Sequence, residues 1–198
     1  MNGEAISPII HSGTTPFSEK ETFPEKKEKK ENVMRKIQLS KVTLNMGVGE
    51  TGEELKKATQ ILQKISNKKP IQTKSKVKIP AWGIREGLPI GIKVTLRKDQ
   101  AISFLKNALK AKENTLPKRS FDKNGNVGFG IKEYIDLPGA KYDPQLGIRG
   151  LDVLVTIERP GYRIKRRKIK PQKVGEYHRI TKEEAIAFMQ ETFGVKVK

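Results

Sequence analysis

Three segments of the chain alternate apolar and polar residues with a period of two: residues 41–46, 90–97 and 150–158. In the first, Val42, Leu44 and Met46 fall on one face and polar residues fall on the other. A period of two is typical of a β-strand with one buried face. We therefore expect three half-buried strands. A fourth, glycine-rich strand is expected over Val127–Ile131, after a turn at Asp122–Gly125.

Three further segments repeat apolar residues every three or four positions, which predicts amphipathic helices. The first begins at Thr51, where Glu54 completes a capping box, and the second begins at Asp99 as its N-cap. The third begins at Thr181 with a second capping box and is closed by Gly194. The residues expected to face inward are Leu55, Ala58, Leu62, Ile65, Ile102, Leu105, Ala108, Leu109, Ala185, Ile186, Phe188, Met189 and Phe193.

These elements do not alternate strictly, and their order favours an α+β fold in which helices cover one face of a mainly antiparallel sheet. The other face of the sheet, with outward Lys and Arg, is a candidate RNA platform. Residues 1–33 mix charges with Pro, Ser, Thr and Gly, so we expect a solvated tail there, with a short helix near 26–32 as the alternative. Residues 34–198 then form a single domain.

The net charge of the chain indicates what the folded protein binds. The 198 residues include 41 Lys and Arg against 22 Asp and Glu, a net charge of +19. The segment 1–33 has five lysines and six glutamates, so the rest carries +20. Two stretches dominate, a loop within 74–97 and a C-terminal arm within 159–182. Such a surface binds nucleic acid or an anionic membrane.

The residue types exclude most catalytic and metal chemistry. The chain has no Cys and two His, His11 and His178, which argues against disulfides, zinc fingers and Cys or His nucleophiles. No pair of carboxylates is set up for acid–base work, so we expect no catalytic residue, metal or cofactor. No apolar run approaches the roughly 18 residues of a membrane helix, and no amphipathic segment joins a basic face to large aromatics. A soluble, intracellular protein without a membrane partner is expected.

The segment Gly47–Gly52 matches G-x-G-x-x-G after a strand and before a helix. A dinucleotide site would also need an acidic residue about 20 positions on, and 67–76 contains none. The alternative of a nucleotide-dependent enzyme rests on this turn alone. A tight turn that needs small residues explains the same pattern. A third interpretation has backbone N–H groups at the N-terminus of the following helix bind an RNA phosphate.

The loop Lys74–Gly87 is basic and contains the only Trp, Trp82. In loop RNA, bases stack on aromatic side chains while Lys and Arg bind phosphates. Trp82 could instead anchor the base of the loop in the core. The alternating lysines could equally protect an edge strand from pairing.

Seven ordered blocks resemble one family. They are 41–49, 69–74, 84–97, 120–126, 130–133, 142–143 and 149–152. Together they are similar to the universal ribosomal protein number five of the large subunit, the 5S rRNA-binding protein of the central protuberance. The resemblance runs from about Met34 to the C-terminus. The long basic run 159–179 and the absence of Cys resemble archaeal members.

The resemblance implies a cytoplasmic structural protein of the large ribosomal subunit. Its implied partners are 5S rRNA, which it helps to attach, large-subunit rRNA, neighbouring large-subunit proteins, the P-site tRNA and, across an intersubunit bridge, small-subunit protein thirteen. The implied 5S rRNA contacts are Asn45, Met46, Gly47, Val48, Gly49, Lys93 and Arg97. Those of the tRNA-contacting loop are Lys74, Lys76, Lys78, Trp82 and Arg85. Those to other rRNA are Arg163, Lys165, Arg166, Arg167, Lys168 and Lys170.

Overall fold

The computed structural model describes residues 32–49 and 52–198. The predicted tail therefore lies outside the described residues, apart from Asn32 and Val33. The helices are α1 (Glu53–Ser66), α2 (Lys98–Lys110), α3 (Arg163–Arg166) and α4 (Lys182–Phe193), with short 3₁₀ turns at Val33–Arg35, Pro80–Trp82, Lys118–Ser120, Tyr134–Asp136 and Glu176–His178. The strands are β1 (Gln38–Gly47), β2 (Ile71–Lys74), β3 (Pro89–Leu96), β4 (Thr115–Leu116), β5 (Asn126–Ile131), β6 (Leu151–Glu158) and β7 (Lys196–Val197).

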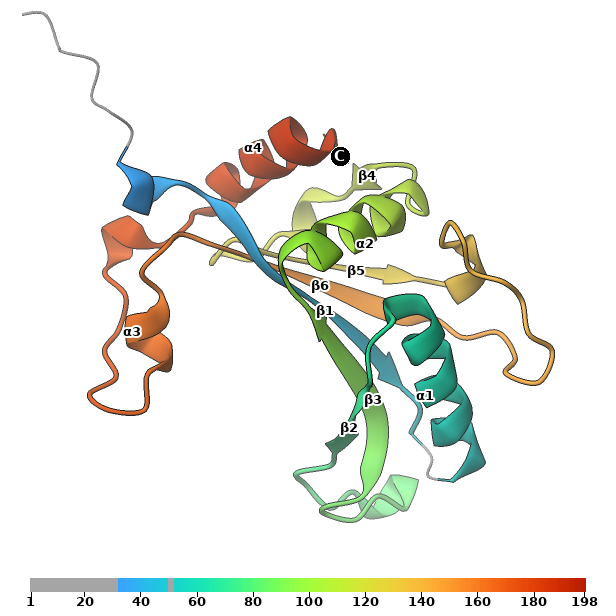
Figure 1. Cartoon of the computed structure of the whole chain (residues 1–198). Helices are drawn as coiled ribbons and strands as arrows, with labels where there is room; N and C mark the ends of the chain where they lie inside the picture. Colours follow the sequence, from blue (N-terminus) through green and yellow to red (C-terminus); the bar gives the residue numbers. More distant parts are fainter. Residues whose placement is uncertain (1–31, 50–51) are drawn as a thin grey trace, which may run out of the picture. The chain divides into compact units, whose positions relative to one another are not determined.

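Five strands form one antiparallel sheet in the order β2-β3-β1-β6-β5 (Figure 1). In its middle, Leu44 of β1 lies opposite Val94 on one side and Val153 on the other. All three are buried because the period-two pattern turns them to the same face. The predicted α+β fold with a mainly antiparallel sheet is confirmed.

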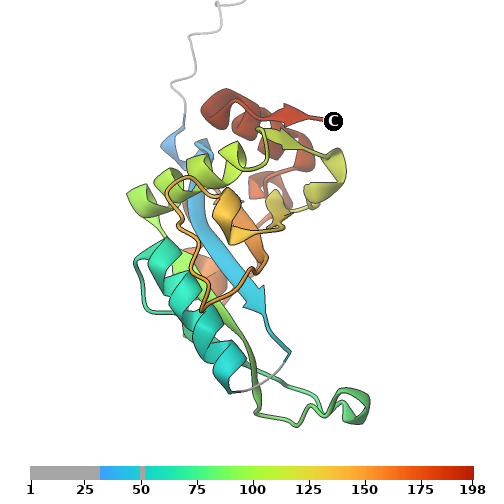
Figure 2. The same ribbon diagram turned by 90° about the vertical axis from the view of Figure 1, so that its right-hand side faces the viewer.

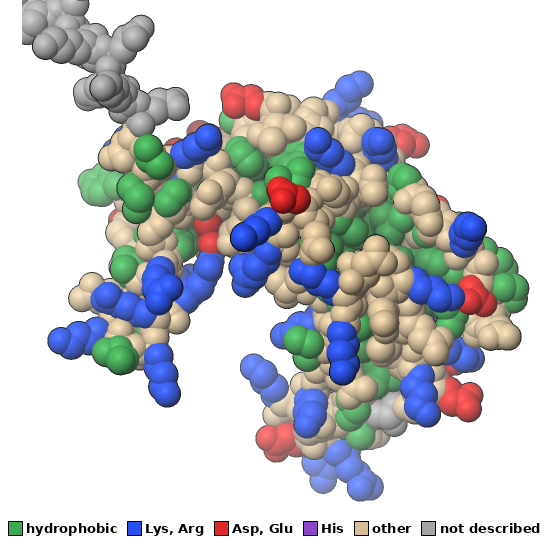
Figure 3. Space-filling view, in the orientation of Figure 1, with side chains coloured by type: hydrophobic (Ala, Val, Ile, Leu, Met, Phe, Trp, Pro, Cys, Tyr) green, Lys and Arg blue, Asp and Glu red, His purple; other side chains and the backbone are tan. Residues whose placement is uncertain are grey.

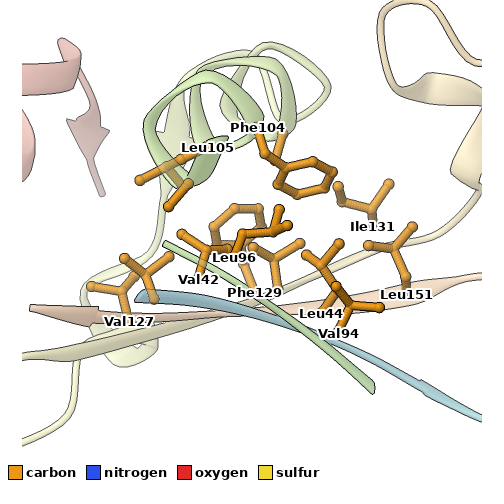
Figure 4. Packing of buried hydrophobic residues seen from close by; sticks show 14 of the residues in the cluster. Val42, Leu44, Val94, Leu96, Phe104, Leu105, Val127, Phe129, Ile131 and Leu151 are labelled. Atoms are coloured by element: carbon orange, nitrogen blue, oxygen red, sulfur yellow. The ribbon is translucent and has the colours of Figure 1, made fainter. Parts of the chain in front are cut away.

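Helices α1 and α2 cover one face of this sheet, and the hydrophobic core lies between the layers (Figure 1). Figure 4 shows Phe104 and Leu105 of α2 above the inward side chains of the strands. Those labelled there are Val42, Leu44, Val94, Leu96, Val127, Phe129, Ile131 and Leu151. The opposite face of the sheet, called the open face below, has no helix of this kind over it among the described residues.

The start of α1 differs from the prediction. Thr51 lies outside the described residues, and Gly52 occupies the N-cap position with φ of 100° and no side chain to cap the helix. Glu54 instead pairs with Lys57, at 3.2 Å, and with Arg149. It thereby fastens the first turn of α1 to the segment that leads into β6.

The start of α2 also differs. Arg97 holds the N-cap position, and Asp99 lies in the first turn, where its charge favours the helix dipole. Ile102 is turned outward, and Ala101 and Phe104 join Leu105 in the core. The predicted inward position of Ile102 is wrong.

The predicted start and end of α4 are confirmed. Thr181 and Glu184 form the reciprocal capping box, and Gly194 ends the helix in the left-handed conformation. Ala185 and Met189 are buried, while the other three predicted inward residues are partly buried against the core. No helix in the described ranges is long and apolar enough to cross a membrane.

Candidate nucleic-acid interface

The open face of the sheet is polar rather than strongly basic. Its outward positions on β1, β3 and β6 bring together Thr43 with Thr95 and Asn45 with Lys93, across hydrogen-bonded strands. Asp152 lies beside Asn45 on β6 and adds an acid. The prediction of a basic platform is therefore met only in part. Hydroxyl and amide groups share the middle of the face with Leu154 of β6, which lies opposite Thr43 and is 47 % exposed. The cations lie on either side of this middle.

The predicted 5S rRNA contacts divide into outward and inward residues. Asn45 and Lys93 lie side by side on the open face, and Arg97 is exposed four residues further along, on the same face as Lys93. Met46 is only 2 % exposed, because its position in β1 points into the core. Its side chain is not available to RNA, and that part of the prediction is wrong.

In the described part of the turn after β1, two backbone N–H groups are already used within the fold. The N–H groups of Val48 and Gly49 both donate to the carbonyl of Ile90, at 3.0 and 2.9 Å. Gly47, the preceding residue, pairs with Gly91 in the ladder. The N–H groups of Val48 and Gly49 are therefore not free to bind a phosphate. Gly47 remains a candidate through its exposed backbone alone.

The same turn does not stand in a dinucleotide-binding unit. β1 is antiparallel to both of its neighbours, β3 and β6. A Rossmann site needs a parallel strand–helix–strand unit. Small residues in the Gly47–Gly49 turn are instead required by the positive φ of Gly49, at 78°.

Residues 74–87, called the hairpin loop below, continue the β2–β3 hairpin beyond the sheet (Figure 2). Backbone hydrogen bonds cross the loop: the N–H of Ser75 donates to the carbonyl of Leu88, and the N–H groups of Ile79 and Ile84 each donate to the other's carbonyl. Ile84 is the buried side chain of the loop. The loop therefore has its own ladder and one apolar anchor.

The predicted tRNA-contacting side chains are all exposed on the hairpin loop. They are Lys74, Lys76, Lys78, Trp82 and Arg85. Among the described residues, none of the four cations makes an ion pair. Trp82 is 73 % exposed, so it is not the core anchor of the loop; Ile84 has that place. β2 is an edge strand, so Lys74 also protects an edge, as the alternative had it.

Residues 159–182, called the basic arm below, leave the end of β6, run through α3 and return to α4 (Figure 1). The arm is an internal excursion between β6 and α4, at the residues where the sequence predicted a basic arm before the last helix. Its first residue, Arg159, is only 8 % exposed. The guanidinium of Arg159 donates to the carboxylate of Glu184 at 2.7 Å and to the carbonyl of Tyr177 at 3.3 Å. Arg159 thus ties both ends of the arm to α4.

Further contacts hold the arm in shape. His178 Nε2 lies 2.7 Å from the carbonyl of Pro160, and the ring of Tyr162 is tilted against the imidazole at 5.9 Å. Burial raises the pKa of the Tyr162 hydroxyl above its ordinary value, so this group stays neutral. The arm is therefore a pre-formed element of the fold.

The six predicted rRNA contacts of the arm are all exposed, but they are not equivalent. Arg166 pairs with Glu158 at the end of β6, and Arg167 donates through Nε to the carbonyl of Lys170 at 2.7 Å. In the described part of the chain, Arg163, Lys165, Lys168 and Lys170 make no ion pair. Figure 3 shows Lys and Arg over the arm, over the hairpin loop and beside the hollow between them.

Comparison of the sequence with known protein families shows which family this chain belongs to. A family model described as ribosomal protein L5 matches residues 32–85, and a second model, described as the C-terminus of that ribosomal family, matches residues 89–188. The chain belongs to the ribosomal protein L5 family. The two matched segments meet at the hairpin loop and include the open face and the whole of the arm.

Relatives of the L5 family from archaea match most of this chain. Each is named large ribosomal subunit protein uL5. The protein from Sulfolobus acidocaldarius is 52 % identical over 169 residues, covering 85 % of this chain and 95 % of the relative. The protein from Nanoarchaeum equitans is 52 % identical over 167 residues, covering 84 % and 99 %. The protein from Archaeoglobus fulgidus is 49 % identical over 174 residues, covering 88 % and 97 %. The predicted archaeal type is confirmed.

Some residues of this L5-family interface escaped the sequence reasoning. Lys41 points outward from β1. The alternation of residues 41–46 puts it on the polar face of that strand, so the sequence could have predicted its place on the open face. Gln38 and Ser40 line a groove beside the arm, which forms only when the arm folds back over the start of β1. Arg159 was counted as one cation among ten, although it holds the arm in place.

The acidic and histidine side chains of the described residues are scattered over the fold. The described residues contain no group of three His, Cys, Asp or Glu side chains that could hold a metal ion. The two carboxyls with depressed pKa values are explained locally: a hydrogen bond from Lys64 lowers the pKa of Asp143, and the backbone N–H of Lys123 lowers that of Asp122. Asp143 belongs to the loop before β6, and Asp122 to the turn before β5, which packs against the end of the basic arm.

Proposed function

We propose that this protein is a non-catalytic rRNA-binding component of the large ribosomal subunit. The named archaeal relatives, which cover almost the whole of the described part, support this assignment. The observation that carries it is the placement of unpaired cations on two excursions beside a sheet face that no described helix covers. An enzyme would instead need convergent reactive groups in a pocket.

The open face is proposed to contact 5S rRNA and help to attach it in the central protuberance. Asn45, Lys93 and Arg97 supply an amide and two cations on one side of the sheet. Thr43 and Thr95 lie between them and add hydroxyl groups, which suit the phosphates and 2′-hydroxyls of an RNA helix. Polar donors of this kind fit shape recognition of RNA without reading its bases.

The two excursions are proposed to contact different RNAs. The hairpin loop extends beyond the sheet and presents Trp82 with four cations, which suits the elbow of a P-site tRNA. The basic arm returns to the body of the fold and suits large-subunit rRNA packed against it. Small-subunit protein thirteen, across an intersubunit bridge, and neighbouring large-subunit proteins complete the proposed partners.

The physical mechanism is neutralisation of phosphates with release of their counterions. Binding strength then depends on salt in proportion to the number of phosphates that are neutralised. Because exposed lysines bring little stability to the free protein, they can be removed without unfolding it. The cations of the hairpin loop are suited to this test.

The triple change of Lys74, Lys76 and Lys78 to Ala should flatten the salt dependence of RNA binding. We expect the slope of log affinity against log salt to fall by about 0.7–0.9 for each phosphate that is no longer neutralised. The measurement is filter binding of 5S rRNA, a large-rRNA fragment and tRNA over a salt series. The matched control changes Lys56, Lys106 and Lys110, exposed on the helices of the opposite face, to Ala. An unchanged slope for both 5S rRNA and tRNA would remove the hairpin loop from the binding surface.

A further inference from the structure

A groove of about 810 Å³ lies between the start of β1, the end of β6 and the basic arm. Called the arm groove below, it is lined by Gln38 and Ser40 on the sheet side and by Pro160–Arg163 and Arg166–Ile169 on the arm side. Its volume falls within the roughly 300–1,000 Å³ that is typical of small-ligand sites. Figure 1 shows α3 standing off the sheet at this end.

One wall of the arm groove is cationic. Arg163 and Lys168 are exposed and have no ion-pair partner in the described ranges, whereas Arg166 is held by Glu158. Arg159 also lines the groove, and it is nine-tenths buried. Two of its nitrogens are hydrogen-bonded, but its Nε has no partner among the described residues. Glu158 also lines the groove, where it pairs with Arg166, and the charge of Arg159 is paired with Glu184. The charge open to a ligand therefore comes from the exposed cations without ion pairs in the described ranges, Arg163, Arg167 and Lys168.

The remaining lining has a different chemistry. Pro160 and Tyr162 offer flat, largely apolar surfaces, and the contact of Tyr162 with His178 fixes the phenol ring. Ile169 is exposed beside the groove without a partner in the core. Across from them, the amide of Gln38 both donates and accepts hydrogen bonds. Simple phosphate binding needs neither the flat surface nor the amide.

We infer that the arm groove binds one unstacked nucleotide of the rRNA. The base lies against Pro160 and Tyr162 with its edge toward Gln38, and its phosphate lies at Arg163 and Lys168. Unstacked bases held against aromatic side chains are the usual route to specific RNA recognition. This inference rests on the proposed rRNA-binding function and adds a single-nucleotide site to it.

The test uses the full-length protein labelled with ¹⁵N, titrated with each of the four nucleoside 5′-monophosphates. Ribose 5-phosphate and inorganic phosphate are the reference probes. We expect at least one nucleotide to shift the amide resonances of Gln38, Ser40 and Tyr162, with an affinity about tenfold above that of inorganic phosphate. A stacked base is worth at least about fivefold, which makes the difference measurable.

A filled groove provides the decisive variant. Ser40→Phe adds bulk without changing charge, and should abolish the nucleotide-specific shifts while the other resonances of β1 stay in place. Ser103→Phe, on the exposed side of α2, is the matched control and should leave the shifts unchanged. If Ser40→Phe fails to fold, Gln38→Ala should still reduce the preference among the four bases.

Two results would overturn the groove without touching the rRNA proposal. Equal shifts from phosphate and nucleotides would mean a plain anion site, and equal shifts from a hexaglutamate peptide would mean a protein-binding site. In either case the full-length protein would still bind large-subunit rRNA with a steep dependence on salt. If that salt-dependent binding were also absent, the proposed function itself would fall.

Discussion

The hairpin loop and the basic arm are both rich in cations, but they are attached to the fold in different ways. The hairpin loop is an outgrowth of two paired strands, with Ile84 as its buried anchor and its cations without ion pairs among the described residues. The arm is attached to the rest of the fold by two ion pairs, Arg159 with Glu184 and Arg166 with Glu158. The cations of the two segments therefore have different roles. In the arm some cations hold the structure, and in the loop they are all available to RNA.

The largest expected effect on stability comes from replacing a glycine that packs against the arm, compared with a glycine inside the hairpin loop. Gly125 has φ of 76°, and an added Cβ would lie 2.7 Å from Cγ2 of Ile180, at the end of the arm. Gly125→Ala combines backbone strain with overpacking and should destabilise the protein by about 3 kcal/mol. Gly83→Ala, in the hairpin loop, has φ of 64° and open space around it, so about 1 kcal/mol is expected. Urea unfolding of the two variants measures the difference, and equal losses would show that the arm is not packed as described.

The next effect separates cations that hold the structure from those that do not. Arg159→Ala removes two hydrogen bonds, one of them to a carboxylate, and should lower the free energy of unfolding by about 2 kcal/mol. Arg85→Ala, in the hairpin loop, should leave stability unchanged, because that side chain is exposed and has no ion-pair partner among the described residues. Thermal unfolding of both variants checks this. The comparison fails if Arg159→Ala is as stable as the parent protein.

The smallest effect concerns a loop held by one exposed ion pair, between Lys64 and Asp143 at 2.8 Å. The hydrogen bond from Lys64 depresses the native pKa of Asp143, so its carboxylate stabilises the fold at any pH above its unfolded pKa. That contribution is lost as the pH falls through the lower native pKa. Asp143→Asn should therefore be slightly less stable than the parent at pH 7 and equal to it in strong acid. A difference that persisted in acid would assign the loop's attachment to other contacts.

The sequence predicted the elements whose signal is local. Val42, Leu44 and Met46 are buried because alternation dictates it, and α4 begins at Thr181 because that residue and Glu184 can cap each other. Prediction failed where the outcome depends on partners distant in the chain. Ile102 is turned outward because Phe104 packs between α2 and the sheet. The local pattern did not show which of these two apolar residues would be buried.

The candidate interface was predictable as a set of charges but not as a surface. Exposure of Lys74, Lys76, Lys78 and Trp82 agrees with the prediction for the hairpin loop. The glycine pattern of the turn after β1 resembled a phosphate-binding loop. In the structure, the N–H groups of Val48 and Gly49 donate to the carbonyl of Ile90, a residue more than 40 positions away. The arm groove could not be predicted from the sequence, because its two walls come together only in the tertiary fold.

Crosslinking in purified ribosomes carrying a P-site tRNA tests the central claim most directly. Ultraviolet irradiation, digestion and mass spectrometry would identify which peptides of this protein carry which RNA. We expect the peptide with Trp82 to carry tRNA, peptides of the basic arm to carry large-subunit rRNA, and the β1 and β3 peptides to carry 5S rRNA. Adducts of the hairpin loop and of the arm with one and the same RNA, or no RNA on either, would contradict the account.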